Sequence, residues 1–383
     1  MASVKIDGFD ASTTSELESV VEHLEGGHGD TIVFIASHVY GAPLADARIA
    51  SISPRAIGLD VREPQGPATA AELRFPEETT TTMGVRGHLI GTLGAARQAQ
   101  PEHPITSIEE ELQTTQSLVT WVGEVRATRT VAKNLLEVTI GGLDGMPEVG
   151  GDEFSYVLIP RPGDDEPLPA GVPFSALQEL PEHRQPHGAY YTTRRRRPEH
   201  GELDLWVYLH GVDGLEGAED VDDPEAAGAP MGEEASAGSP TVAQWAATAA
   251  PGDQLALWGP RRGYHPPENT QRHVLVCDET GLAAAAALID QYQSAEVVLV
   301  AKVAGPNRRP PMPEHPALTE HWYGPDDQGH DLVAAVRSLG LVPGATSAFG
   351  AAESREISAV RRLLRNELGF AATDVHMTGY WRA

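Results

Sequence analysis

Three residues in the middle of the chain have side chains that could together hold a flavin. Tyr191 offers an aromatic ring to cover the isoalloxazine, Thr192 a hydroxyl for a ring nitrogen, and Arg194 a guanidinium for a pyrophosphate. A tyrosine–threonine pair is also ordinary in a β-strand, where both residue types pack well. The segment on its own therefore leaves strand packing and cofactor binding open.

A second candidate site lies in a turn between an apolar run and an alanine-rich segment. Asp278, Thr280 and Gly281 occupy this turn, where a phosphate could meet the N-terminus of a helix. The turn lacks a Gly-x-Gly-x-x-Gly pattern, so it supports a dinucleotide site only weakly. Glu353 opens a later helix, where it could serve a nucleotide site or act only as a favourable N-terminal charge.

A basic loop is the candidate for contact with an anionic ligand. Lys302, Arg308 and Arg309 follow an apolar segment, and two prolines after them stiffen the chain. Parallel strands end on the ligand-binding edge of their sheet, so this loop could face a bound cofactor. The competing interpretation is a solvated loop with incidental charges.

Two histidines near the start of the sequence, His23 and His28, are five residues apart. At that spacing they share a helix face less well than a metal pair at i and i+4 would. We therefore expect them to cap a helix end or to pack, and we predict neither a metal site nor haem ligation there.

The elements that must position these residues fall into three blocks. Residues 1–106 mix helical spacing with short strands, which predicts a small α+β domain. Residues 107–267 contain short β segments separated by Gly and Pro, which predicts a barrel or sandwich. Residues 268–383 alternate apolar strands with helices, which predicts an α/β domain with a parallel sheet. Inside the second block, residues 212–238 carry nine acidic and no basic side chains, which predicts a disordered insertion.

The expected strands can be given as residue ranges. In the second block they are 118–126, 135–140, 154–159, 189–194, 203–209 and 254–258. In the third block they are 273–277, 296–303, 346–349 and 375–380.

Composition excludes several classes of partner. The 28 basic and 55 acidic side chains give a net charge of −27, so neither nucleic acid nor an anionic membrane surface is an expected partner. No apolar stretch approaches the roughly 20 residues of a membrane span, and residues 1–12 lack the apolar core of a signal peptide. Cys277 is the one cysteine, which excludes intrachain disulfides and fits a cytoplasmic protein. The scarcity of lysine is typical of a GC-rich bacterial genome.

Taken in order, the motifs of residues 115–383 resemble those of the siderophore-interacting protein family, also called ferric-siderophore reductases. The family's Arg-x-Tyr-Thr-x-Arg pattern is present from its tyrosine onward, its Glu-Leu-Asp, His-Gly and Trp-Ala-Ala patterns follow in order, and its Asp-Glu-Thr lies at residues 278–280. The resemblance implies the following FAD-binding residues: Tyr191, Thr192, Arg194, His210, Gly211, Thr241, Val242, Ala243 and Trp245.

Two departures from the family pattern affect this prediction. Ala189 stands where the family has its first arginine, and Arg184 or Arg195 could replace that phosphate contact. The loop before Trp245 is degenerate, although its backbone N–H groups could still bind a pyrophosphate. The first block is similar to a small domain of unknown function found with haem-utilisation proteins, whose core motif matches at both His23 and His28.

The resemblance implies a multidomain α+β protein of ferredoxin reductase-like type: a Greek-key β-barrel flavin domain followed by a nucleotide-type α/β domain. It implies an oxidoreductase of iron uptake that uses FAD to reduce siderophore-bound Fe(III) to Fe(II), with NADH, NADPH or ferredoxin as the donor. Outer-sphere electron transfer needs no protein acid or base, so we assign no catalytic residue. The alternatives are a flavin-containing siderophore-binding protein without turnover, or a haem-handling protein.

Overall fold

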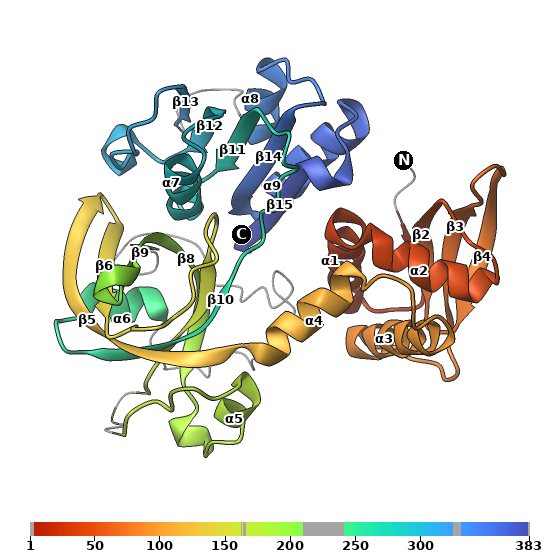
Figure 1. The fold of residues 1–383 in the computed structure, drawn as a ribbon, viewed down its shortest axis with the longest axis horizontal. Coiled ribbons are helices and arrows are strands. Elements are labelled where there is room, and N and C mark those ends of the chain that lie inside the picture. The colour runs from red at the N-terminus through yellow and green to blue at the C-terminus, as the bar shows by residue number, and fades with distance from the viewer. Residues whose placement is uncertain (1–3, 162, 164–165, 210–240, 325–330, 382–383) are drawn as a thin grey trace. The chain divides into compact units, whose positions relative to one another are not determined.

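The computed structural model describes residues 4–161, 163, 166–209, 241–324 and 331–381 (Figure 1). The chain divides into two compact units, the first ending at Thr115 and the second beginning at Gln116. The acidic insertion predicted at 212–238 lies outside the described residues.

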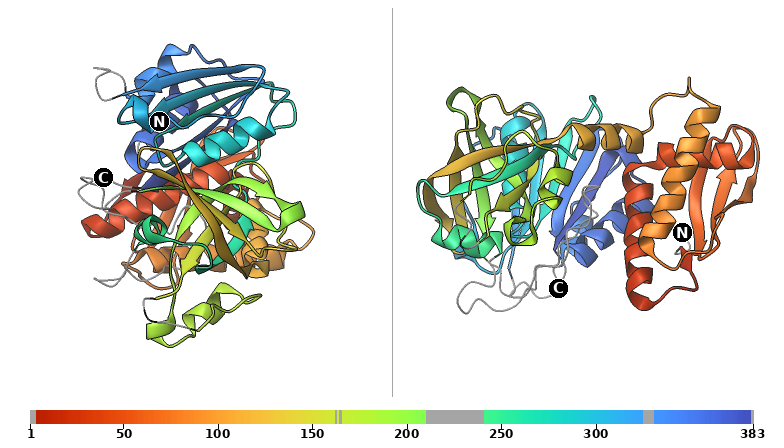
Figure 2. Two further views of the ribbon diagram at one scale, coloured as in Figure 1. Left: turned by 90° about the vertical axis from the view of Figure 1, so that its left-hand side faces the viewer. Right: turned by 90° about the horizontal axis from the view of Figure 1, so that it is seen from below.

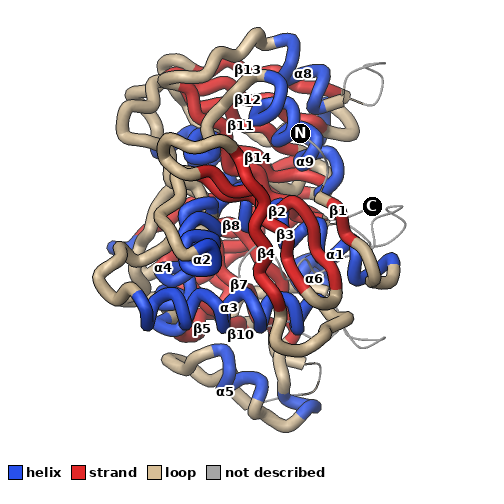
Figure 3. The backbone as a smooth tube through the Cα atoms, turned by 90° about the vertical axis from the view of Figure 1, so that its right-hand side faces the viewer, coloured by secondary structure: helices blue, strands red, loops and turns tan. Residues whose placement is uncertain are grey.

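The first unit is a small α+β domain, as the sequence predicts. Its sheet has the order β1 (Lys5–Ile6), β2 (Asp46–Ser53), β3 (Ala56–Arg62) and β4 (Ala68–Arg74). Strands β2 to β4 are antiparallel and lie side by side (Figure 3), while β1 pairs parallel to β2. The helices are α1 (Ala11–Gly27), α2 (Gly29–Tyr40), α3 (Thr82–Ala99) and α4 (Ser107–Ser117).

Two helices of this unit, α1 and α3, start where a polar side chain caps them. The side chain of Asp10 accepts a hydrogen bond from Thr13 N at the start of α1, and Thr81 caps α3 in the same way. Their apolar faces meet the sheet in one core, which includes Leu17, Phe34, Ile57 and Val85.

Helix α4 lies in the first unit up to Thr115, whereas the boundary predicted from the sequence is at residue 106. Glu109 pairs with Arg97 of α3 at 2.6 Å, and Ser107 N donates to Asp30 at 2.8 Å. The Arg97 guanidinium holds the pKa of Glu109 at about 2. These contacts join the start of α4 to the first unit, whose boundary lies between Thr115 and Gln116. Which segments fold on their own remains a prediction.

The second unit begins with a closed barrel whose six strands all fall where the sequence predicts them. They are β5 (Val119–Ala132), β6 (Leu135–Gly141), β7 (Phe154–Ile159), β8 (His187–Arg197), β9 (Glu202–Tyr208) and β10 (Gln254–Arg261). All neighbours are antiparallel, in the order β10-β5-β6-β9-β8-β7, so the chain crosses from β6 to β7 and returns at β9 in a Greek-key path. The short helices are α5 (Phe174–Gln178) and α6 (Val242–Thr248), and α6 adds its apolar side chains to the barrel core.

A parallel five-stranded sheet follows, in the order β13-β12-β11-β14-β15. The strands are β11 (Arg272–Cys277), β12 (Glu296–Lys302), β13 (Leu318–Tyr323), β14 (Thr346–Glu353) and β15 (Val375–Trp381). Helix α7 (Leu282–Gln291) packs on one face, and α8 (Leu332–Ser338) and α9 (Ser354–Arg362) pack on the other (Figures 1 and 2). The four predicted strands are confirmed, and β13 is an edge strand that the sequence analysis missed.

One glycine lets the α/β domain close tightly. A Cβ atom at Gly281 would lie 2.2 Å from the carbonyl oxygen of Ala351, so any other residue would push α7 away from β14. The turn that contains Asp278 and Thr280 is therefore held against the neighbouring strand.

In the part of the chain that the structure describes, no helix has the length and apolar character needed to cross a membrane.

Candidate active site

Strand β8 joins the barrel to the α/β domain within the second unit. The Thr192 and Tyr380 hydroxyls lie 3.0 Å apart, which connects β8 to β15. Arg194 Nη1 donates to Asp290 Oδ2 of α7 at 2.6 Å. Thr192 and Arg194 therefore share the face of β8 that meets the α/β domain, as residues two apart on a strand should.

Tyr191 points the other way. It packs with Ala189 against the barrel core and is partly buried. Its cross-strand partner is Ser155 of β7. The three residues that the sequence grouped as one flavin contact thus divide between the two faces of β8, because side chains alternate along a strand.

Several buried polar atoms on β7, β8 and β10 have no hydrogen-bond partner among the described residues, and they include Ser155 Oγ, Arg194 Nε and Arg261 Nε. A buried donor or acceptor left without a partner costs about 1–3 kcal/mol, so such atoms are rare unless a ligand or water completes them. Arg194 is only 4% exposed, and its Nε–H suits a phosphate or carbonyl oxygen. The region therefore fits a cofactor rich in hydrogen-bonding atoms.

The sequence analysis missed a buried guanidinium close to this region. Arg261 of β10 lies against the rings of Phe154, Tyr190 and Trp258, and its Nη2 donates to the Tyr190 hydroxyl at 2.5 Å. Tyr190 adjoins Ala189, where the family's arginine is missing. Arg261 could not be singled out from the sequence, because what distinguishes it from other arginines is its buried position at the end of β10.

The two arginines that the sequence proposed as replacements differ from Arg261. Arg184 pairs with Glu166 at 2.6 Å, and Arg195 is exposed on β8. Neither is a buried side chain, so Arg261 is the better candidate for the missing contact.

The predicted pyrophosphate loop forms the start of helix α6. Thr241 and Gln244 form a capping box, in which each side chain accepts a hydrogen bond from the other's backbone N–H. Val242 and Ala243 bury their side chains in the barrel core, and Trp245 packs against that core. The groups of this loop that could bind a pyrophosphate are the backbone amides of the first helical turn, because these amides have no acceptor within the helix. His210 and Gly211 lie outside the described residues.

The Glu-Leu-Asp motif holds the β8–β9 hairpin together. Arg197 donates to both oxygens of Asp204, at 2.5 and 2.7 Å, and also to Glu202 at 3.1 Å. Although burial opposes it, hydrogen bonding from Arg197 and Thr139 lowers the pKa of Asp204. The motif therefore fixes the end of β8, the strand that carries Thr192 and Arg194, to β9.

The Asp278 carboxylate gathers four donors from three parts of the α/β domain. Oδ1 accepts from the backbone and the hydroxyl of Thr280, at 2.8 and 2.6 Å. Oδ2 accepts from Glu353 N at 3.0 Å and from Trp381 Nε1 at 2.7 Å. Burial raises the pKa of Asp278 in spite of these hydrogen bonds. The structure thus brings together Asp278, Thr280 and Glu353, three of the predicted nucleotide-binding residues. The Thr280 hydroxyl, however, donates its proton to Asp278 and not to a ligand.

Glu353 retains one oxygen for further contacts. Its Oε2 accepts from Glu356 N at 2.9 Å and caps α9, whereas its buried Oε1 has no partner among the described residues. Two acidic side chains at this edge of the sheet suit hydroxyl or amide donors better than phosphate groups.

The basic loop is less positive than its sequence indicates. Lys302 Nζ donates to both carboxylate oxygens of Glu356, at 3.0 and 2.9 Å. Arg308 donates to Glu279 at 2.9 Å and also to the Tyr208 hydroxyl. Arg309 is exposed, and its guanidinium lies 5.5 Å from the Trp322 ring centre. Of the three predicted contacts, Lys302 and Arg308 are paired with carboxylates, whereas exposed Arg309 has no ion pair with a described carboxylate and is the better candidate for an anion.

A closed Greek-key barrel, a parallel α/β domain and buried polar groups on the connecting strand define the two-domain architecture of flavin-dependent reductases. Residues 124–264 match the siderophore-interacting FAD-binding domain, and residues 270–383 match the siderophore-interacting protein model. The chain belongs to the siderophore-interacting protein family, and its barrel is an FAD-binding domain.

Similar proteins agree with this assignment. Ferric vibriobactin reductase of Vibrio cholerae is 26% identical over 264 residues, covering 66% of this chain and 85% of that protein. An uncharacterized Mycobacterium tuberculosis protein is 26% identical over 278 residues, covering 68% of this chain and 89% of that protein. The solved siderophore-interacting protein of Aeromonas hydrophila has a TM-score of 0.52 at 21% identity, covering 70% of this chain and 100% of its own. A siderophore utilization protein from T. fusca gives 0.51 at 22% identity, covering 70% of this chain and 94% of its own, so both show the same fold.

Proposed function

We propose that this protein is an FAD-dependent reductase that converts siderophore-bound Fe(III) to Fe(II) in the cytoplasm. The observation that carries the proposal is the pair of contacts from β8, Thr192 to Tyr380 and Arg194 to Asp290. They lie where the FAD-binding barrel meets the α/β domain, so a flavin held by β8 would adjoin the domain expected to receive the electron donor.

The chain's own residues would hold the cofactor by different means. On the face of β8 that meets the α/β domain, the Thr192 hydroxyl would bond a ring nitrogen and Arg194 Nε would meet an oxygen. Tyr191, whose side chain lies on the other face of the strand, would supply the aromatic cover of the ring. Backbone amides at the start of α6, together with His210 and Gly211, would bind the pyrophosphate. Arg261 would take the role of the missing arginine at position 189.

FAD, when bound, supplies the ability to accept two electrons together and to release them one at a time. The chain then needs no acid or base at the iron, because the substrate gains only an electron. Fe(II) is less hard than Fe(III) and binds oxygen ligands more weakly, so the siderophore would release it.

The electron donor is proposed to be NADH, NADPH or ferredoxin. For a pyridine nucleotide, Asp278, Thr280 and Gly281 would shape the contact, and Glu353 Oε1 would accept from an amide or hydroxyl group. The acidic character of this edge argues against a phosphate directly beside Glu353, so we place any phosphate farther along the turn.

The cofactor assignment has a direct test. Flavin released by heating the purified protein should chromatograph as FAD and should account for close to one molecule per chain. Release of FMN or of no flavin would overturn the proposal. A Soret band in place of a flavin spectrum would favour a haem-handling protein.

A further inference from the structure

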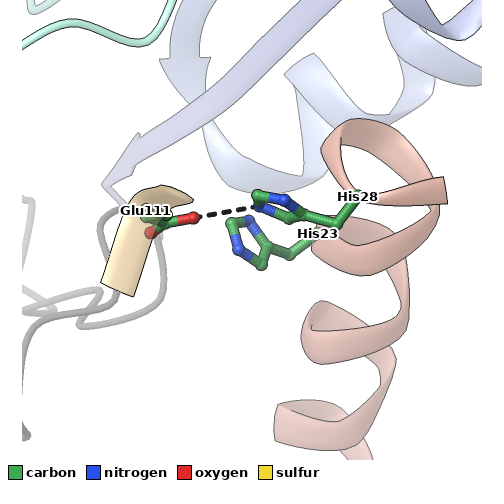
Figure 4. Close-up of side chains that lie close together, drawn as sticks. All are labelled: His23, His28 and Glu111. Carbon is green, nitrogen blue, oxygen red and sulfur yellow. Dashed lines mark ion pairs between the residues drawn. The ribbon is translucent and has the colours of Figure 1, made fainter. Parts of the chain in front are cut away.

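Three side chains with metal-binding atoms come together in the first unit (Figure 4). His23 lies near the end of α1, His28 lies at the junction of α1 and α2, and Glu111 lies on α4. One nitrogen or oxygen from each lies within 4.8 Å of the others. His28 is buried, and the other two side chains are partly buried.

The local structure explains why these residues meet. Helix α1 ends at Gly27 and α2 begins at Gly29, so the turn at His28 brings its ring to 4.6 Å from that of His23, centre to centre. Ser107 anchors the start of α4 through its N–H and hydroxyl, which donate to the two oxygens of Asp30 at 2.8 and 2.5 Å. Glu111 follows Ser107 by one helical turn and therefore lies on the same face of α4.

The hydrogen bonds around His28 determine which ring nitrogen carries a proton. The Ser107 hydroxyl gives its proton to Asp30, because an ionised carboxylate can only accept. Ser107 Oγ must then accept from His28 Nδ1, which lies 2.9 Å away. In the neutral imidazole this leaves a lone pair on Nε2, and Nε2 lies 3.1 Å from Glu111 Oε2. Two lone pairs at that distance repel, unless a cation lies between them or the ring itself is charged.

We propose that His23, His28 and Glu111 bind a first-row divalent transition-metal ion. Imidazole nitrogen and carboxylate oxygen bind Zn²⁺ at about 2.0–2.2 Å, so two such donors on one ion lie roughly 3 Å apart. The His28–Glu111 distance of 3.1 Å already meets this requirement, and the His23 ring completes the set by a side-chain rotation. Two histidines and one carboxylate leave coordination positions open for water or a ligand.

The surrounding groups suit this role. The contact from His28 Nδ1 through Ser107 to Asp30 is the kind of outer hydrogen bonding that orients a ligating histidine. The spacing of the two histidines argued against metal binding because residues five apart share a helix face poorly. In the structure His28 lies beyond the end of α1, and Glu111 comes from another helix. This inference does not depend on the proposed reductase function.

The test is a calorimetric titration of the full-length, flavin-loaded protein, freed of metal, with Zn²⁺. High salt in the buffer suppresses weak binding to the acidic surface, since exposed charges are screened within about 3 Å at 1 M salt. We expect one tight Zn²⁺ per chain, with affinity at least 10-fold weaker in Glu111→Gln. Ser107→Ala should weaken it by about 10- to 100-fold through the lost outer contact. Glu110→Gln removes an exposed neighbouring charge and should leave affinity unchanged.

Three results would overturn the proposal. Absence of tight Zn²⁺ binding would mean that His28 and Glu111 form only an ion pair. Equal affinity in Glu111→Gln and Glu110→Gln would put the ion elsewhere. A haem spectrum that disappears in His28→Ala would assign the histidines to haem. If His28→Ala does not fold, Glu111→Gln still tests the site, because it keeps the side-chain volume. A thermal unfolding curve that matches that of the metal-free wild type verifies that Glu111→Gln is folded.

Discussion

Arg194 and Asp290 form an ion pair whose partners differ in exposure. The Arg194 side chain is 4% exposed and the Asp290 side chain 44%, with 2.6 Å between Nη1 and Oδ2. The buried guanidinium also lies over the Trp206 ring, 5.1 Å from its centre. A half-exposed carboxylate contributes little to such a pair, so the buried arginine needs another partner to account for its position.

We therefore expect the two partners to respond differently to substitution. Arg194→Gln should lower FAD affinity at least 10-fold, because it removes the buried Nε–H that we propose donates to the cofactor. Asp290→Asn should keep FAD and cost less than about 1 kcal/mol of unfolding free energy. Titration of apo-protein with FAD, followed by fluorescence, measures both. Equal losses of FAD affinity would show that Arg194 only ties β8 to α7.

Tyr191 provides a separate test of where the flavin ring lies. Tyr191→Ala should reduce FAD occupancy and shift the flavin absorption bands, because the ring loses its aromatic cover. Tyr191→Phe retains the aromatic ring and should leave both nearly unchanged. If the alanine variant keeps full occupancy and an unaltered spectrum, then Tyr191 serves only the barrel core against which it packs.

His273 should make the second unit less stable in mild acid. Burial lowers the pKa of this histidine from 6.5 to about 4, and its ring stacks on Tyr292 at 3.8 Å between centres. The unfolded chain then binds the proton more readily, so stability falls as the pH drops from about 6.5 to about 4, by at most about 3 kcal/mol.

Urea unfolding at pH 7 and at about pH 4.5 tests this dependence. The loss between the two pH values should be smaller in His273→Gln, which cannot titrate. His200→Gln, an exposed histidine of the same unit, should behave like the wild type. An unchanged loss in His273→Gln would contradict the assignment of the pH dependence to His273.

Arg309 should matter more than its basic neighbours for an anionic substrate. Lys302 and Arg308 are already paired with Glu356 and Glu279, so their charges are largely compensated locally. Arg309→Ala should raise the apparent KM for an anionic ferric siderophore severalfold, and high salt should diminish the effect. Lys302→Ala should change it little.

A neutral ferric acceptor separates steering from structure in this experiment. Its reduction should be the same in Arg309→Ala and in the wild type. A loss of equal size for both acceptors would mean that the loop is structural, and no loss for either would mean that the substrate approaches elsewhere.

The sequence predicted the elements with strong apolar patterns and missed those without them. Barrel strands such as β7 and β9 are continuous or alternating in their apolar residues, and the inner strands of the parallel sheet are buried on both faces. Strand β13 was missed because its residues Thr319, Glu320 and His321 are polar, as an edge strand allows. The apolar pattern of the sequence does not show that a polar segment pairs with the edge of a sheet, as β13 does with β12.

The sites were predictable as residues but not as geometry. Tyr191, Thr192 and Arg194 were found by their types, yet strand alternation separates Tyr191 from the other two. The partners of Lys302 and His28, which are Glu356 and Glu111, lie far away in sequence. Ion pairs between residues so far apart in sequence depend on tertiary packing, which neither the spacing of residues nor the composition reveals.

We propose that flavin in this protein transfers electrons to siderophore-bound iron. The most direct measurement is anaerobic absorption of the purified yellow protein during two additions, first an electron donor and then a ferric siderophore, with a chelator present to trap Fe(II). NADH, NADPH and reduced ferredoxin are tried as donors, with dithionite as a control that reduces the flavin directly. We expect bleaching of the flavin bands, followed by their recovery with about two Fe(II) trapped per flavin, since the flavin stores two electrons. If the dithionite-bleached protein stays colourless with ferric siderophore, while the siderophore still binds, then the protein is a siderophore-binding flavoprotein and not a reductase.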